Sequence, residues 1–246
     1  MSLVGSDLKT AALIEIAGGK LRVAIAISAT PGAFWASRDA AGEPQGVSID
    51  LASALAGELG LPMTLVPYEN SSAITAAAAT GWDVTFIPMD DERAKKIDFG
   101  PVYNVAESTF IVRAGSGVEK LAEVDRPGVR VVAVADTTTM RACAAWLKQN
   151  SVEGFDAVDD IVTRLRDGRA DAFAMSRDGL NILARALPGS RVLPGQFFDA
   201  KTAVASPQNR PATLACASAF IEAAKAGGLM RRIYDSNGMA DSPVAQ

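Results

Sequence analysis

Residues 21–27 have the sequence LRVAIAI, an apolar run with three β-branched side chains that predicts a buried strand. The residues Thr30-Pro31-Gly32 then break the run, and the loop that follows carries Phe34 and Trp35. This stretch therefore predicts one strand of a sheet with a substantial loop at its carboxyl end.

Strand-like and helix-like segments alternate along the rest of the chain. Leucines at helical spacing follow Asp50, and Gly60 with Pro62 ends that helix. We predict further strands at residues 63–67, 84–87, 129–135, 170–175, 191–193 and 202–205, and helices at 50–59, 74–79, 138–148, 158–166, 180–187 and 211–226. This alternation favours an α/β fold with mostly parallel sheets.

The alternation is interrupted at residues 108–117, which end in Gly-Ser-Gly, and it then starts afresh. We therefore expect two lobes of the same plan with a ligand cleft between them. Residues 21–110 and 200–246 would form the first lobe, and residues 111–199 the inserted second lobe. Residues 1–20 would be a leader and N-terminal segment, since Met-Ser-Leu at the start suggests an expression leader and no export signal is present here.

The composition excludes several classes of function. Among 246 residues there is no histidine, which excludes Ser-His-Asp and Cys-His nucleophile pairs and every histidine metal site. A net charge of −4 argues against nucleic acid as a partner. The two cysteines, Cys143 and Cys216, have no zinc-finger spacing, and we expect two free, buried thiols in different lobes. No phosphate-binding or metal motif is present, so we expect neither a cofactor nor a metal.

Ligands of open α/β sheets bind beyond the carboxyl ends of the strands, so the segments that follow each strand are candidates. After the strand at 84–87, Pro88 leads into three acids and Arg93. Arg93 is either a bidentate clamp for a carboxylate or a solvated or locally paired side chain. Phe34 and Trp35 would stack on a ligand or plug their loop against the core.

In the second set of elements, Asp136-Thr137-Thr138-Thr139 joins a strand to a helix. Hydroxyls and free N–H groups at a helix start form an anion site, and ordinary N-capping by Thr138 or Asp136 is the compatible alternative. We expect Trp82 and Trp146 to be packing residues. Five aspartates are predicted to be caps or solvated side chains: Asp98, Asp156, Asp159, Asp160 and Asp171.

These residues together resemble the bacterial extracellular solute-binding proteins, family 3, over residues 21–234. Four blocks carry the resemblance: GVSIDL at 46–51, GWDV at 81–84 through Arg93 to IDF at 97–99, DTT at 136–138, and GRADAFAMS at 168–176. The resemblance implies a two-lobed periplasmic-binding-protein-like fold of type II. It implies hinges near residues 108–113 and 199–205, by which the cleft closes on a small carboxylate-bearing solute.

The resemblance also implies the roles of particular residues. Arg93 falls on the arginine that binds the ligand carboxylate, and Thr137 and Thr138 fall on the helix start that holds it. Ser176 stands where the family presents an aspartate to the ligand's ammonium. Either Asp178 or Glu69 takes over that role, or the solute is not a standard amino acid. The complete implied ligand-binding set is Phe34, Trp35, Glu69, Pro88, Asp90, Arg93, Thr137, Thr138, Ser176 and Asp178.

By this resemblance the chain is the periplasmic receptor of an ABC uptake transporter. Its partners would be an amino acid or related organic acid and the transporter permease, and we expect a monomer that binds no nucleic acid and is not an enzyme. The alternative is a periplasmic cyclohexadienyl or arogenate dehydratase on the same fold. That reaction needs an acid over a leaving group, for which Asp90 is the candidate.

Overall fold

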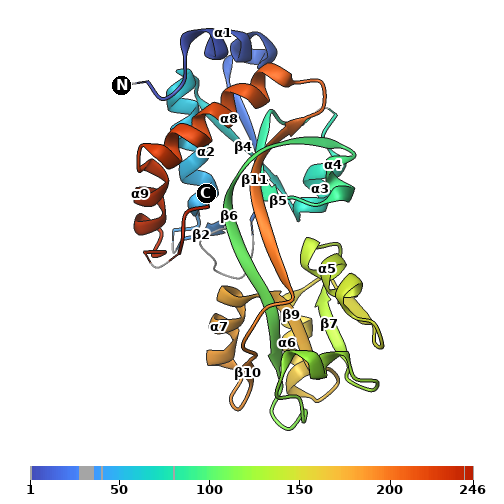
Figure 1. Ribbon diagram of the computed structural model, residues 1–246. Helices are drawn as coiled ribbons and strands as arrows, with labels where there is room; N and C mark the ends of the chain where they lie inside the picture. Colours follow the sequence, from blue (N-terminus) through green and yellow to red (C-terminus); the bar gives the residue numbers. More distant parts are fainter. Residues whose placement is uncertain (1, 28–35, 40, 80, 241, 246) are drawn as a thin grey trace. The chain divides into compact units, whose positions relative to one another are not determined.

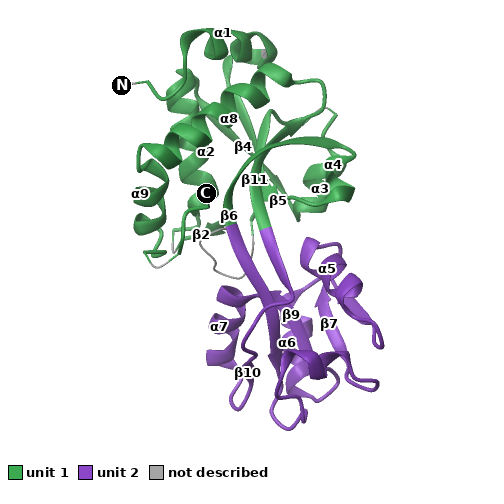
Figure 2. Cartoon of the chain, in the orientation of Figure 1, with its two compact units in different colours: residues 1–104, 201–246 green, residues 105–200 purple. Residues whose placement is uncertain are grey.

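The computed structural model describes residues 2–27, 36–39, 41–79, 81–240 and 242–245 (Figure 1). The chain divides into two compact units, which Figure 2 shows in different colours. Unit 1 comprises Met1–Asn104 and Lys201–Gln246, and unit 2 comprises Val105–Ala200. The sequence places the corresponding boundaries at 110/111 and 199/200.

The sheet strands of unit 1 follow the order β4 (Met63–Tyr68), β1 (Leu21–Ala26), β5 (Val84–Pro88) and β11 (Phe198–Pro207). Strand β1 pairs in parallel with both β4 and β5, whereas β11 is antiparallel to β5. The carboxyl ends of β1, β4 and β5 therefore lie at one edge, which positions the segments after them together. A separate short ribbon joins β2 (Ser37–Arg38) to β3 (Pro44–Gln45).

The described part of unit 1 contains six helices: α1 (Ser6–Glu15), α2 (Val47–Leu59), α3 (Ser71–Ala76), α4 (Asp91–Ala94), α8 (Pro211–Ala226) and α9 (Leu229–Ser236). Helix α2 ends at Gly60, whose φ of 69° is a left-handed conformation that suits glycine. One core contains buried residues of α2, α8 and α9, and a second contains Ile74 of α3 and Trp82. A short 3-10 turn, Ala17–Gly19, follows α1.

Residues 6–15, which the sequence assigned to a leader and N-terminal segment, form helix α1. The carboxylate of Glu15, the last residue of α1, accepts hydrogen bonds from the backbone N–H groups of Ala212 (3.1 Å) and Thr213 (2.7 Å) at the start of α8. Burial alone would raise the pKa of Glu15. The hydrogen bonds from Thr213 and Ala212 together outweigh this effect, so the pKa lies below its ordinary value. Glu15 thus caps α8, which also has Pro211 at its first position.

In unit 2, strand β7 (Val131–Val134) is parallel to β8 (Val152–Phe155) and to β9 (Ala172–Ser176). Strand β6 (Ile97–Val112) is antiparallel to β9 and to β10 (Arg191–Val192). Strands β6 and β11 each include residues of both units. Strand β8, the length of β6 and helices α1 and α9 were not predicted from the sequence.

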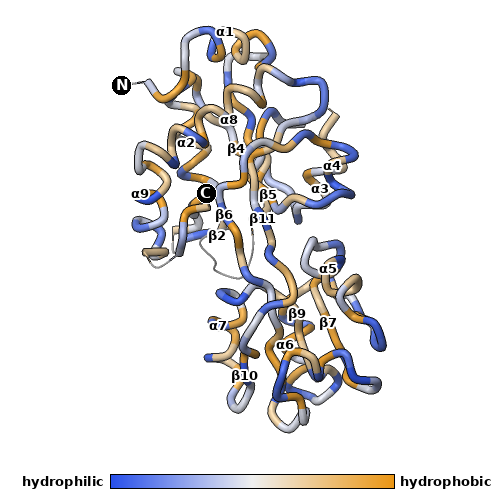
Figure 3. The backbone as a smooth tube through the Cα atoms, viewed as in Figure 1, coloured by the Kyte–Doolittle hydropathy of each residue, from blue (hydrophilic) through white to orange (hydrophobic). Residues whose placement is uncertain are grey.

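Helix α5 (Thr138–Trp146) contributes to one core of unit 2, and α6 (Val158–Arg166) and α7 (Arg177–Ala186) contribute to another. A 3-10 turn, Leu121–Asp125, precedes β7. Figure 3 shows the hydrophobic colouring of β7, whose residues Val131 and Val132 belong to the two different cores. The predicted α/β class, with mostly parallel strands flanked by helices, is confirmed. Among the described residues, none of the helices is long and apolar enough to span a membrane.

Candidate functional site

The side chain of Arg93 lies at the carboxyl ends of β4 and β5 and is only 3% exposed. Its Nη1 donates a hydrogen bond to the carbonyl oxygen of Pro88, the last residue of β5, at 2.5 Å. Its Nη2 donates to Oγ of Ser71, the first residue of α3, at 2.8 Å. Both acceptors are neutral oxygens, and these two bonds fix the orientation of the guanidinium.

Two N-caps hold the backbone around this arginine. Asp90 is the N-cap of α4, and its Oδ1 accepts a hydrogen bond from the backbone N–H of Arg93 at 2.9 Å. Asn70 is the N-cap of α3 and accepts from the N–H of Ala73 at 2.9 Å. Asp90 is the acid that the dehydratase alternative needs. In this structure its carboxylate caps α4 through the backbone N–H of Arg93.

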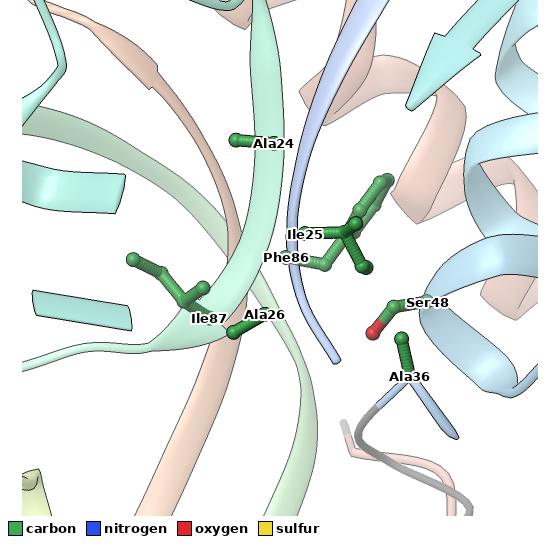
Figure 4. Close-up of a pocket in the computed structure, with 7 residues that line it drawn as sticks. All are labelled: Ala24, Ile25, Ala26, Ala36, Ser48, Phe86 and Ile87. Atoms are coloured by element: carbon green, nitrogen blue, oxygen red, sulfur yellow. The ribbon is translucent and has the colours of Figure 1, made fainter. Parts of the chain in front are cut away.

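Three further unit 1 residues belong to the implied set: Phe34, Trp35 and Glu69. Glu69 is exposed in the segment between β4 and α3. Phe34 and Trp35 fall outside the described residues. A cavity of about 10 Å³, large enough for about one water molecule, lies under the ends of β1 and β5. Its lining residues are Ala24, Ile25, Ala26, Ala36, Ser48, Phe86 and Ile87 (Figure 4).

In unit 2 the turn from β7 to α5 is built by Thr137. Its Oγ1 accepts a hydrogen bond from the backbone N–H of Met140 at 3.1 Å and donates to the carbonyl of Val134 at 2.8 Å. Thr137 is therefore the N-cap, and the prediction that Thr138 or Asp136 would cap this helix is wrong. Asp136 instead takes a left-handed backbone conformation, with φ of 56°, which turns the chain into the helix.

Hydroxyl groups gather at the carboxyl end of the neighbouring strand β9. Ser176, the last residue of β9, pairs in register with Ser108 of β6. The Oγ of Ser108 lies 3.4 Å from Oγ1 of Thr139 in α5. Thr138, the residue before Thr139, is buried. Asp178, in the first turn of α7, is exposed.

Glu107 and Asp171 of unit 2 each form ion pairs with arginines. Glu107 Oε2 accepts from Nε of Arg177 at 2.6 Å. Asp171 is 6% exposed and pairs with Arg113 and Arg130, so the prediction that it is a cap or a solvated side chain is wrong. Burial raises the pKa of Asp171, but its hydrogen bonds from Arg130 and Arg113 lower it more, to about 2.

Two residues that were not singled out from the sequence contact predicted ones: Ser71 bonds to Arg93, and Ser108 lies next to Thr139 of the Asp136–Thr139 motif. Ser71 lies four residues after the predicted strand at 63–67, so the rule that sites follow strand ends could have identified it. Ser108 gave no such signal, because its proximity to Thr139 depends on the pairing of β6 with β9 and on the position of α5.

Other expectations about single residues are confirmed. Trp82 is 1% exposed, and its Nε1 donates to the carbonyl of Ile74 at 3.1 Å. Cys143 in unit 2 and Cys216 in unit 1 are free and buried, and burial raises the pKa of Cys143 to about 12. Within the described part of the chain, no group of three or more candidate ligand side chains could hold a metal ion.

Residues 21–239 match the family model of the bacterial extracellular solute-binding proteins, family 3. The chain belongs to this family. This family 3 protein is 24% identical over 212 residues to the ABC transporter glutamine-binding protein GlnH of Bacillus subtilis (strain 168). The match covers 82% of this chain and 75% of that protein. It is 28% identical over 165 residues to the L-cystine-binding protein TcyJ of Escherichia coli (strain K12), covering 64% of this chain and 60% of that one.

Solved structures support the same fold for this family 3 protein. An ancestral amino acid-binding protein, described as a precursor of cyclohexadienyl dehydratase, has a TM-score of 0.75 and 25% identity, covering 94% of this chain and 99% of that one. A mutant of ArgBP from T. maritima has a TM-score of 0.77 and 21% identity, covering 92% and 98% of the two chains.

Proposed function

We propose that this chain is the solute-binding receptor of an ABC uptake transporter and that it binds a small carboxylate-bearing solute without transforming it. The observation that carries the proposal is the buried guanidinium of Arg93, held at the carboxyl ends of β4 and β5 by Pro88 and Ser71. A guanidinium fixed in this way is suited to bidentate contact with a carboxylate. The family membership and the relatives named as binding proteins support this proposal.

The remaining parts of the proposal follow from the family. The solute would be an amino acid or a related organic acid, the receptor would be periplasmic and monomeric, and a permease would take the solute from it. Glu69, Asp178, Thr137 and Thr138 belong to the proposed binding set, together with the aromatic residues 34 and 35. We place the hinge of closure in β6 and β11, because each of these strands includes residues of both units.

The dehydratase alternative is not favoured. The Oδ1 atom of Asp90, the acid that this reaction would need, accepts the backbone N–H of Arg93 as the cap of α4. A direct assay for turnover of prephenate or arogenate distinguishes the two functions, and we expect no turnover.

The test of the carboxylate contact compares substitutions of two cationic side chains, Arg93 and Lys95, which lie two residues apart in the sequence. A thermal-shift panel of amino acids and amine-free carboxylates first finds a binder, since a ligand at 100 times its Kd adds about 2.7 kcal/mol of stability. Calorimetry then compares Arg93→Met with Lys95→Met, which removes an exposed charge nearby. We expect Arg93→Met to weaken binding at least about 100-fold, because two charge-assisted hydrogen bonds are lost, and Lys95→Met to leave it unchanged.

Because Arg93 is buried, its replacement also leaves Ser71 and the Pro88 carbonyl without these donors. Circular dichroism of both variants therefore accompanies the titration, and Arg93→Lys provides a variant that keeps the charge but not the fork of donors. Wild-type affinity in a folded Arg93→Met protein would contradict the proposed carboxylate contact.

A further inference from the structure

Unit 2 contains a groove that is separate from the segments of the proposed binding set. The groove has a volume of about 380 Å³, which is within the range of small-molecule sites. Its walls are the end of β6, the loop that follows β6 and the start of β10, all of which belong to unit 2 (Figure 2). We call it the distal groove, and its lining includes Arg113, Gly115, Ser116, Gly117, Glu119 and Arg191.

The register of β6 and β9 places the distal groove away from Ser176. Val112 pairs with Ala172, the first residue of β9, and Ser108 pairs with Ser176, the last. This strand of 5 residues spans about 13 Å between its ends. The distal groove therefore lies at the amino end of β9, whereas the proposed binding residues of unit 2 follow the carboxyl ends of β7 and β9.

Arg191 brings a cationic side chain to the distal groove. It is the exposed first residue of β10, and its Nη2 donates a hydrogen bond to the carbonyl oxygen of Val118 at 3.1 Å. This contact holds the guanidinium against the loop, and Arg191 forms no ion pair with any described residue. A guanidinium has several N–H donors, so Arg191 keeps most of them for an anion.

The loop adds neutral donors from its backbone and from Ser116. The backbone N–H groups of Gly115 and Gly117 form no hydrogen bond within the described chain. Oγ of Ser116 accepts from the backbone N–H of Val118 at 3.3 Å, and the hydroxyl keeps its own proton to donate. Backbone N–H groups gathered on a turn are a common means of binding anions.

The charges around the distal groove favour an anion. Glu119 is an exposed acid in the lining. Asp171, beside the groove, accepts from both Arg113 and Arg130, so one carboxylate faces two guanidinium groups. The cationic side chains at positions 112–130, 171 and 191 outnumber the acidic ones, with Arg113, Lys120, Arg126, Arg130 and Arg191 against Glu119, Glu123, Asp125 and Asp171. The whole chain, in contrast, has a net charge of −4.

We propose that the distal groove binds a phosphate-type oxyanion, with Arg191 as its main cationic contact. A tetrahedral phosphate has acceptor oxygens on several sides, so it can accept from the guanidinium, the Ser116 hydroxyl and the glycine N–H groups at once. A planar carboxylate has fewer oxygens and would leave some of these donors unused. Free phosphate and a phospholipid headgroup both carry the required group. This site is independent of the proposed solute contact at Arg93.

Nitrogen–proton correlation NMR of the full chain, titrated with inorganic phosphate at constant ionic strength, locates the anion. We expect the largest shift changes at the backbone N–H groups of Gly115, Ser116 and Gly117. Acetate should bind at least about tenfold more weakly, because it offers less charge and fewer oxygens. Shift changes that leave out this loop, or an equal affinity for acetate, would overturn the inference.

Three substitutions predict effects of different sign. Arg191→Met should weaken phosphate binding at least about tenfold, because a charge-assisted contact is lost. Glu119→Gln should strengthen it about twofold, because a nearby negative charge is removed, and damage to the fold would not produce such a gain. Arg185→Met removes an exposed charge in the last turn of α7 and should leave the affinity unchanged. Wild-type affinity in Arg191→Met, or an equal loss in Arg185→Met, would contradict the assigned contact.

Co-sedimentation with vesicles distinguishes the two sources of the phosphate group. If the ligand is a headgroup, phosphatidylglycerol vesicles should sediment the wild type but not Arg191→Met, and inorganic phosphate should compete. If the ligand is free phosphate, the wild type stays in solution with these vesicles while the shift changes in the loop remain. The absence of both the shift changes and any vesicle binding that depends on Arg191 would overturn the inference.

Discussion

The two units carry the same ion pair at the amino ends of their parallel strands. In unit 1, Asp83 precedes β5 and accepts from the backbone N, Nε and Nη2 of Arg22 at 2.9, 3.1 and 2.7 Å. In unit 2, Asp171 precedes β9 and accepts from the same three atoms of Arg130 at 3.0, 2.8 and 2.9 Å. The backbone N–H of each aspartate donates back to the carbonyl of its arginine, at 2.8 and 2.9 Å.

The carboxyl ends of the same strands differ. Strand β5 ends at Pro88, whose carbonyl orients a buried arginine, whereas β9 ends at Ser176 beside neutral hydroxyls. The repeated ion pair joins neighbouring parallel strands and serves stability in both units. The difference shows that the amino ends of these strands perform a shared structural task, while the carboxyl ends, where α/β proteins bind ligands, are free to diverge.

Asp83→Ala should produce the largest loss of stability. Asp83 is fully buried and also lies 3.4 Å from Nη1 of Arg210, so its removal leaves two arginines without their shared carboxylate. We expect the free energy of unfolding to fall by about 3–5 kcal/mol, as for a broken buried ion pair. Urea denaturation followed by circular dichroism measures this loss, and a change below about 1 kcal/mol would contradict the structural role.

Asp171→Ala should cost less, about 1–3 kcal/mol. The side chain of Arg130 is 49% exposed, compared with 24% for Arg22, so water can replace more of the lost contacts in unit 2. The same urea denaturation applies, with Asp167→Ala as a control because Asp167 forms an exposed ion pair with Arg169. A larger loss for Asp171→Ala than for Asp83→Ala would reverse the ranking.

The Asp171 ion pair should also appear in the pH dependence of stability. Its pKa is lowered from 3.8 to about 2 in the folded chain, so its contribution is fully present above pH 4 and is lost as the pH falls from about 4 to about 2. We expect the wild type to lose about 1–2 kcal/mol more than Asp171→Asn over this range. Identical acid profiles of the two proteins would show that this carboxylate is not selectively stabilised by folding.

The smallest expected effect is a change in the labelling rates of the two thiols, Cys143 in unit 2 and Cys216 in unit 1. Burial raises the pKa of Cys143 and of Cys216, so neither should react with an aromatic disulfide reagent in the native chain. Asp171→Ala should increase the labelling rate of Cys143 more than that of Cys216, and Asp83→Ala should do the opposite. Mass spectrometry of labelled peptides distinguishes the thiols, and equal acceleration of both would show that the units open together.

Several elements could be predicted from sequence because their signals are local. Helix α8 begins at Pro211 and ends before Gly227, and α6 has the bounds that its apolar spacing indicates. Strand β8 could not be predicted, because Val-Glu-Gly-Phe has little strand character and becomes a strand by pairing with β7. Asp171 was misassigned for a related reason, since its two arginine partners are 41 and 58 positions away.

The sequence by itself determined the α/β class, the alternation of elements and the family blocks around Arg93 and Ser176, because apolar periodicity, turn residues and short motifs are properties of neighbouring positions. Only the tertiary structure decided that Arg93 is buried against Ser71, that Ser108 faces Thr139 and that Asp83 and Asp171 have equivalent partners. The physical reason is that strand register and helix packing bring distant polar groups together, and burial then makes those contacts strong.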